Sequence, residues 1–200
     1  MFSQIRPAIV MILLFSALTG VIYPLAITGI AQAVMARTAN GSLVVNNGAV
    51  VGSTLIGQAF GGETYFHGRP SATNTADPND ATKTIDAPYN AANSSGSNFG
   101  PTSQKLHDRV KTDVEALGGS PDKPVPADAV TTSASGLDPD ISPAFARLQA
   151  SRVAAARKLP EDRLQALVTS AIQHPVLGLF GEPRVNVLAL NLELDRLAAK

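Results

Sequence analysis

The residues that could carry out chemistry in this chain lie mainly in one polar segment, TSASGLDPDIS, at positions 132–142. Its serines invite a hydrolase interpretation, but the segment lacks the first glycine of the G-x-S-x-G motif that presents a nucleophilic serine. A catalytic serine also needs a general base, and no histidine lies nearby in the sequence. We therefore interpret Ser133 and Ser135 as parts of a polar turn, and we expect no catalytic residue in the chain.

Acidic side chains in the same segment invite a cation-binding interpretation. Asp138, Asp140 and Ser142 occupy alternating positions, and hard cations prefer carboxylate and carbonyl oxygens. The EF-hand loop pattern with its terminal glutamate is absent, however. The chain has three widely spaced histidines and no cysteine, which excludes thiolate zinc and iron–sulfur centres. We expect no metal ligands here, and a turn in which Asp138 folds back onto the backbone.

Charge and motif content argue against two further classes of protein. Sixteen basic and sixteen acidic residues balance to a formal charge of zero. This predicts no nucleic-acid partner, because binding to a polyanion depends on a surplus of Lys and Arg. The chain has neither a G-x-x-x-x-G-K-[ST] phosphate loop nor a G-x-G-x-x-G motif. No cofactor-binding residue is therefore indicated by a motif.

A membrane-spanning helix is the strongest signal in the sequence. Thirty residues between Arg6 and Arg37 carry no charge, whereas about 20 suffice to cross roughly 30 Å of hydrocarbon. A cleaved secretory signal is the alternative, because Ala31-Gln32-Ala33 has the form of a cleavage site. The apolar stretch is longer than a signal core of roughly 7–15 residues, which favours a retained anchor. By the positive-inside rule, Arg6 predicts a cytoplasmic N-terminus and an extracytoplasmic C-terminal domain.

One face of this helix carries small and hydroxylated residues. Ser16, Thr19, Gly20 and Tyr23 recur at helical spacing, and such residues form close helix–helix contacts in lipid. Pro24 has no N–H, so the carbonyl of Gly20 loses its helical partner and needs a donor from elsewhere. We predict that these five residues contact a partner helix, although a kinked lone anchor accommodates them as well.

The rest of the chain, residues 38–200, predicts a single mixed α/β domain, so the expected fold class is α+β with one transmembrane helix within residues 1–37. Residues 42–60 predict a hairpin across Asn46-Asn47-Gly48. Residues 66–101 are rich in Gly, Ser, Pro, Asn and Asp and predict a long loop. A loop of this length inside a compact domain is functional or mobile.

Three candidate partner contacts lie in this loop. Arg69 stands beside a turn in HGRPS and could receive an anion or an acidic partner, with a solvated or salt-bridged arginine as the alternative. Tyr89 and Asn98 belong to stretches rich in amides and flexible backbone. Such stretches suit a partner surface, although a plain linker has the same composition.

Helical signals dominate the C-terminal half. Residues 102–117 predict a helix with Leu106, Val110, Val114 and Leu117 inward, and Ser142-Pro143 predicts the start of another that runs to about residue 158. The inward face of that helix should consist of Phe145, Leu148, Val153 and Ala156. The inward face of the helix after Pro160 should consist of Leu164, Leu167, Val168 and Ile172. VNVLALNLEL alternates and predicts a strand at 185–194, although Val187, Leu190 and Leu194 also have helical spacing. A short helix over 194–199 should follow.

Seven segments of the chain resemble, in sequence and in order, those of a known family. They are GSTLIGQAF (52–60), YFHGRPSAT (65–73), SGSNFGPT (95–102), RVKTDVEAL (109–117), VPADAVTTSASGLDPDISP (125–143), RVAAARKL (152–159) and GEPRVNVLALNLELD (181–195). The family that they resemble is KdpC, the C subunit of the bacterial Kdp potassium-transporting P-type ATPase. The resemblance extends over essentially the whole chain, including Thr19-Gly20 and Tyr23-Pro24 in the anchor. Ser95 and Ser103 stand where the family often has Gly and Asn.

The resemblance implies a non-catalytic subunit of the inner (plasma) membrane. Its implied partners are a channel-like potassium-binding subunit, a P-type ATPase subunit and a small single-span subunit, and ATP and potassium ion are implied for the complex. The phosphorylated D-K-T-G-T motif of P-type pumps is absent from this chain. The family is also described as a catalytic chaperone that raises the ATP affinity of the pump subunit. Since an extracytoplasmic domain does not meet cytoplasmic ATP, we expect assembly and stabilisation of the complex to be the physical role.

Two other functions fit parts of the sequence. A membrane-tethered hydrolase would use Ser133 or Ser135, and a periplasmic solute-binding protein would be released by cleavage near Ala33. Neither accounts for the ordered motifs.

Overall fold

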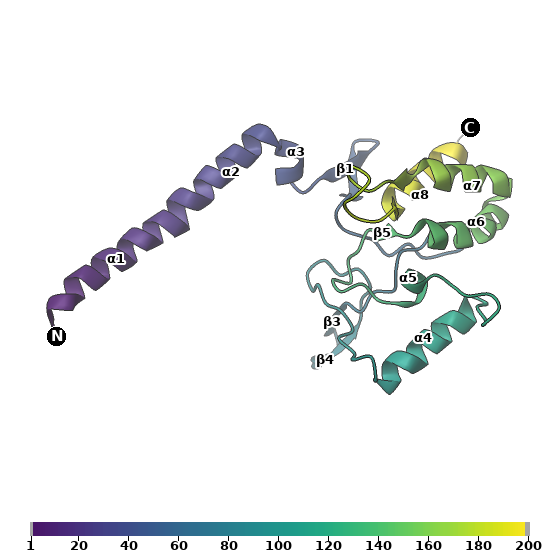
Figure 1. The fold of residues 1–200 in the computed structure, drawn as a ribbon, viewed down its shortest axis with the longest axis horizontal. Coiled ribbons are helices and arrows are strands. Elements are labelled where there is room, and N and C mark those ends of the chain that lie inside the picture. The colour runs from purple at the N-terminus through teal and green to yellow at the C-terminus, as the bar shows by residue number, and fades with distance from the viewer. Residues whose placement is uncertain (1, 199–200) are drawn as a thin grey trace. The chain divides into compact units, whose positions relative to one another are not determined.

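The computed structural model describes residues 2–198 of the chain. It divides into two compact units, residues 1–53 and residues 54–200 (Figure 1). The first unit contains the long N-terminal helix and a β-hairpin, and the second contains the remaining helices and strands. The predicted mixed α/β fold with one N-terminal helix long enough to span a membrane is confirmed. The predicted boundary between residues 37 and 38 stays a prediction.

The N-terminal helix is continuous over Ile5–Val34 and has an irregular middle. A short 3₁₀ turn, η1 (Phe2–Gln4), leads into α1 (Ile5–Ala17), a π-helical stretch η2 (Leu18–Ile22) and α2 (Tyr23–Val34). At η2 the Tyr23 N–H donates to the Leu18 carbonyl, and the Thr19 hydroxyl donates to the Phe15 carbonyl at 2.7 Å. A π-bulge is one way in which a helix accommodates a proline such as Pro24, whose ring removes a donor. The irregular turn therefore falls where Pro24 disturbs the backbone ladder.

The first unit ends in the hairpin that the sequence predicts. After α3 (Ala36–Ala39), strands β1 (Leu43–Asn46) and β2 (Ala49–Ser53) pair antiparallel. Asn47 and Gly48 form the turn with φ values of 50° and 78°. Both residues tolerate the left-handed region that a tight hairpin turn requires, so the Asn-Gly signal is confirmed.

The core of the second unit is made by three helices and a small sheet. The helices are α6 (Pro143–Arg157), α7 (Glu161–Ser170) and α8 (Val187–Ala198). The sheet has the order β5 (Asp140–Ile141), β7 (Arg184–Asn186), β6 (Ile172–Gln173), all antiparallel. The largest fully buried apolar side chains are Phe66, Val153, Leu164, Val168, Val185, Leu190 and Leu194. These buried side chains hold together the helices and the sheet from which the polar loops extend.

The helix α6 begins as predicted, because the Ser142 hydroxyl accepts a hydrogen bond from the Phe145 N–H at 3.0 Å and Pro143 takes the first helical position. Two side chains predicted to face inward do not. Leu117 and Ala156 are exposed, and Leu117 follows the last helical residue, Ala116. The helix α4 (Gln104–Ala116) otherwise forms where the sequence predicts it.

The predicted strand at residues 185–194 is wrong beyond Asn186. Only β7 (Arg184–Asn186) is extended, and α8 starts at Val187. The Asn186 side-chain oxygen accepts from the Ala189 N–H at 3.0 Å, which satisfies a donor of the first helical turn. Val187, Leu190 and Leu194 are all buried, so the helical spacing decides the structure rather than the alternation. Residue 199 of the predicted terminal helix lies outside the described residues.

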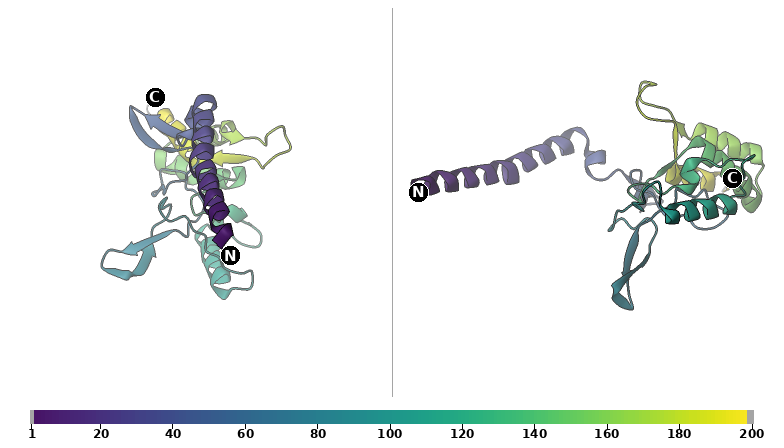
Figure 2. Two further views of the ribbon diagram at one scale, coloured as in Figure 1. Left: turned by 90° about the vertical axis from the view of Figure 1, so that its left-hand side faces the viewer. Right: turned by 60° about the horizontal axis from the view of Figure 1, so that its bottom comes forward.

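The predicted long loop at residues 66–101 is partly wrong, because it contains a hairpin. Strands β3 (Asn74–Asp77) and β4 (Asp80–Asp86) pair antiparallel and project from the second unit (Figure 2). The Asp77 carboxylate accepts from the Asn79 N–H at 2.8 Å and closes the turn. Composition signalled the turn residues but not the short strand TKTI beside them. A last helical turn, α5 (Ala127–Val130), precedes the polar segment 131–139.

A candidate partner-binding site around Arg69

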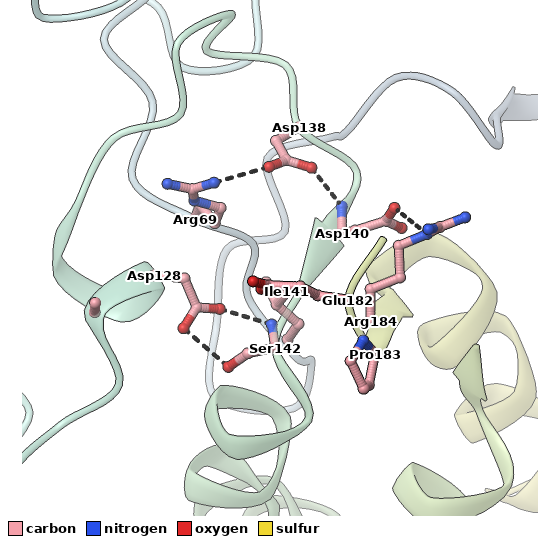
Figure 3. A pocket seen from close by; sticks show the side chains of 10 residues that line it. Arg69, Asp128, Asp138, Asp140, Ile141, Ser142, Glu182, Pro183 and Arg184 are labelled. Carbon is pink, nitrogen blue, oxygen red and sulfur yellow. Dashed lines mark hydrogen bonds and ion pairs between the residues drawn. The ribbon is translucent and has the colours of Figure 1, made fainter. Parts of the chain in front are cut away.

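The predicted contact Arg69 is the centre of a polar network in the second unit. Its Nη1 atom lies 3.0 Å from Oδ2 of Asp138, and Nη2 lies 3.4 Å from the Thr131 and Thr132 carbonyl oxygens. The other Asp138 oxygen accepts from the Asp140 N–H at 3.0 Å, as predicted for a carboxylate that folds back onto the backbone (Figure 3). Arg69 and Asp138 are 25% and 29% exposed, so the salt-bridged alternative for Arg69 is what the structure shows. We call this pair and its neighbours the Arg69 junction.

Tyr89 belongs to the same junction. Its hydroxyl donates to the Arg69 carbonyl at 2.7 Å, and its backbone has a φ of 62°. A Cβ at Gly57 would lie 2.5 Å from the Tyr89 ring, and a Cβ at Gly68 would lie 2.1 Å from the Tyr89 hydroxyl oxygen. Burial, with Asp138 nearby, raises the pKa of Tyr89 to about 12. Tyr89 is therefore a neutral donor at physiological pH, and two glycines make room for its ring.

Hydrogen bonds made by serine residues join three segments that are distant in the sequence at the junction. The Ser71 hydroxyl donates to the Gly136 carbonyl at 2.8 Å and accepts from the Tyr89 N–H at 3.0 Å. The Ser95 N–H donates to the Ser135 carbonyl at 3.0 Å. Gly136 has a φ of 68°, and a Cβ there would lie 2.7 Å from the Ser95 carbonyl oxygen. Segments 65–73, 95–102 and 125–143, which are far apart in the sequence, therefore form one interlocked surface.

A groove of about 410 Å³ opens beside the junction (Figure 3). Three of its acidic side chains, those of Asp128, Asp138 and Asp140, are already engaged. Asp140 lies 3.0 Å from Nε of Arg184, and Asp128 accepts from the Ser142 N–H at 2.7 Å and from the Ser142 hydroxyl at 2.9 Å. Within residues 2–198 no group of His, Cys, Asp or Glu is placed to hold a metal ion. The groove thus combines the paired charges Arg69–Asp138 and Arg184–Asp140 with the carboxylate of Glu182, which suits a polar contact surface.

The surroundings of Asp140 in the groove lead to a testable prediction about its pKa. Burial raises the pKa of Asp140 above 3.8, while the hydrogen bond from Asn186 and the charge of Arg184 lower it. Because the folded pKa is raised, the contribution of Asp140 to stability is present below pH 3.8 and is lost as the pH rises through the raised value. Arg184→Gln should raise this pKa further. Carbon-13 NMR titration of the full chain in micelles measures it, and a wild-type pKa at or below 3.8 contradicts the account.

Two buried amide side chains hold the segment that leads to Arg69. Asn191 on α8 accepts from the Phe66 N–H and donates to the Phe66 carbonyl, both at 2.9 Å. Gln149 on α6 does the same for His67, at 2.7 and 3.0 Å. Both side chains are at most 5% exposed. Sequence reasoning missed these residues, although a polar residue inside an apolar helical stripe, as in LALNLEL, is the signal that could have found them.

The other predicted contacts lie apart from the junction. Ser16, Thr19, Gly20, Tyr23 and Pro24 are exposed on the N-terminal helix. Apart from the adjoining backbone of that helix, no atom of residues 2–198 lies within 4 Å of a Cβ built at Gly20. Asn98 is exposed and has a φ of 53°. Of the loop candidates, the structure brings Arg69 and Tyr89 together and leaves Asn98 on the surface.

The serines of the hydrolase alternative are built into the loop. Ser133 is 5% exposed, and the Ser135 hydroxyl accepts from the Leu137 N–H at 3.1 Å. These contacts are those of the polar turn that the sequence predicts.

Comparison with known proteins identifies the relatives of this chain. The model of the KdpC family, described as the c chain of K⁺-transporting ATPase, matches residues 5–196. A potassium-transporting ATPase KdpC subunit of Bradyrhizobium diazoefficiens is 61% identical over 201 residues, covering 100% of both chains. Subunits of the same name from Methylorubrum extorquens and Methylobacterium nodulans are each 60% identical over 201 residues, again with 100% coverage.

Proposed function

The chain belongs to the KdpC family of K⁺-transporting ATPase c chains, and from this membership we propose that it is a non-catalytic subunit that assembles and stabilises the complex. The proposed partners are a potassium-binding channel-like subunit, a P-type ATPase subunit and a small single-span subunit. In this proposal, ATP and potassium ion belong to those partner subunits of the complex. Identity across the whole chain is the observation that carries this proposal, because it includes both the anchor and the Arg69 junction.

The N-terminal helix supplies the first proposed contact. It is thirty residues long and contains an 18-residue stretch with a mean hydropathy of 2.3, in which none of the residues is buried by the described part of the chain. In lipid, small residues allow a second helix to approach closely, and hydroxyl groups can donate across the contact. We place the partner helix against Ser16, Thr19, Gly20, Tyr23 and Pro24.

The Arg69 junction supplies the second proposed contact. Arg69 is paired with Asp138 and Arg184 with Asp140, so a partner can cover these four side chains without leaving their charges unpaired. Arg69 and Tyr89 act there mainly by fixing the backbone of segments 65–73 and 125–143, while Asn98 offers an exposed amide to the partner. A preformed surface of this kind loses little conformational entropy on binding. Any increase in the ATP affinity of the pump subunit would then be indirect, through the stability of the assembled complex.

Sidedness follows from the same proposal: the N-terminus is cytoplasmic and the second unit lies outside the plasma membrane. The chain has no cysteine, so single introduced cysteines report their location without background. We expect Ala91→Cys to react with a membrane-impermeant maleimide in sealed spheroplasts, and Ser3→Cys to react only after lysis. Both positions are exposed. The opposite labelling pattern, with Ser3→Cys reacting first, contradicts the proposed orientation.

A further inference from the structure

The connection between β6 and β7 ends in a small hairpin, residues 175–181, which we call the apolar tip. Val176 and Phe180 form an antiparallel bridge, with N–H to O distances of 2.9 and 3.0 Å in the two directions. Leu177 and Gly178 form the turn with φ values of 55° and 71°. A left-handed φ is unfavourable for a bulky residue such as leucine and persists where the surrounding structure imposes it. The apolar tip therefore has a defined shape, and it projects from the second unit (Figure 2).

The side chains of the apolar tip are unusually exposed. Leu177 and Leu179 are 83% and 80% exposed, and Val176 and Phe180 are 63% and 66% exposed. Even on the N-terminal helix, which faces lipid, the most exposed large apolar side chain among the described residues is Val34 at 75%. A cluster of exposed apolar side chains marks a site of interaction with protein or membrane. A protein surface and a lipid membrane are therefore the two candidate partners of the apolar tip.

The lack of charge on the apolar tip favours a protein surface over a lipid membrane. No charged residue lies between His174 and Glu182, and the basic Arg184 is held by Asp140 at 3.0 Å. Loops and helices that bind an anionic lipid surface combine apolar residues with a surplus of Lys and Arg. The apolar tip lacks this surplus, because residues 175–181 carry no charged side chain. A narrow, neutral and preformed projection instead suits a recess in a protein, where aliphatic and aromatic anchors bind.

We propose that the apolar tip inserts into an apolar recess on another subunit of the K⁺-transporting ATPase. This inference rests on the proposed function, since it requires a partner subunit. Leu177 and Leu179 are the anchors, with Val176 and Phe180 at the edge of the contact. Burial of each leucine should contribute about tenfold or more to the affinity for the partner.

Photo-crosslinking in the native complex tests which molecule contacts the apolar tip. A benzophenone amino acid replaces Leu179 in the full-length chain, and the complex is irradiated in its membrane before purification. We expect a crosslink to another subunit of the ATPase. A crosslink to lipid alone, a crosslink to a second copy of this chain, or no crosslink in a complex that still copurifies overturns the inference.

Substitution provides the energetic test. The double variant Leu177→Ser/Leu179→Ser should lower the affinity of the chain for the other subunits roughly a hundredfold, whereas Ile85→Ser, a 44% exposed apolar residue on β4, should change it little. Near-UV circular dichroism checks that both variants fold. Full retention of the double variant overturns the role of the apolar tip and leaves the proposed function intact. Failure of the wild-type chain to copurify with any ATPase subunit overturns both.

Discussion

Asn191→Leu should lower the free energy of unfolding of the second unit by about 4 kcal/mol, because it leaves both the N–H and the carbonyl of Phe66 buried without a partner. Each unsatisfied buried backbone group costs about 1–3 kcal/mol. Leucine is close to asparagine in size, so the change in packing contributes less than the lost hydrogen bonds. Phe66 and Asn191 are 0% and 1% exposed, which leaves no room for water to replace the amide.

Denaturant unfolding of the full chain in micelles, followed by near-UV circular dichroism of the tyrosines, measures this effect. Tyr65 is a suitable reporter, since its ring contacts Phe60 at 5.5 Å between centroids and is adjacent to Phe66. Glu193→Leu on the same helix is the matched control. It removes an exposed pair with Arg196, which is worth about 0–1 kcal/mol. Equal stability of the two variants contradicts the amide clamp.

Gly20→Leu should reduce the amount of ATPase subunits retained by the chain about tenfold. The bulky side chain would stand where a partner helix approaches the backbone, and in the described part of the chain only the adjoining helix backbone lies near that position. The loss therefore reports the interface rather than a clash within the subunit. Copurification in mild detergent at a series of detergent concentrations measures retention.

Gly29→Leu is the control for this substitution. Among the described residues, a Cβ at Gly29 likewise has no atom within 4 Å other than the adjoining helix backbone. Six residues at about 100° each place Gly29 on a different side of α2 from Tyr23. Both variants add the same apolar surface to the membrane span. If the two variants retain the partners equally, the helix face defined by Gly20 and Tyr23 is not the contact.

The sequence predicts the parts of this fold that depend on local signals. The uncharged stretch after Arg6, the Asn47-Gly48 turn and the Ser142-Pro143 helix start each have one dominant physical cause. Where two periods fit the same residues, as in residues 185–194, the outcome depends on tertiary burial. There Val187, Leu190 and Leu194 meet the core, and the Asn186 side chain completes the helix start.

The candidate site was predictable only in part. Arg69 and Tyr89 could be selected as unusual residues in a long polar segment, but their contact depends on chain crossings between positions 69, 89 and 138. No local pattern encodes such a crossing. The glycines at 57 and 68 are informative only when the Tyr89 ring is in place, because the requirement is for space rather than for a turn. Gln149 and Asn191 have a local signal, a polar residue inside an apolar helical stripe, but their partners His67 and Phe66 lie far away in the sequence and are not encoded locally.

Isolation of the chain from membranes by a C-terminal tag tests the central proposal most directly. We expect the other subunits of a K⁺-transporting ATPase to copurify in fixed stoichiometry, with K⁺-stimulated ATP hydrolysis present in the complex and absent from the chain alone. Complex lacking this chain should lose integrity and activity together. ATP hydrolysis by the isolated chain, or an ATPase that stays assembled and fully active without it, would contradict the account.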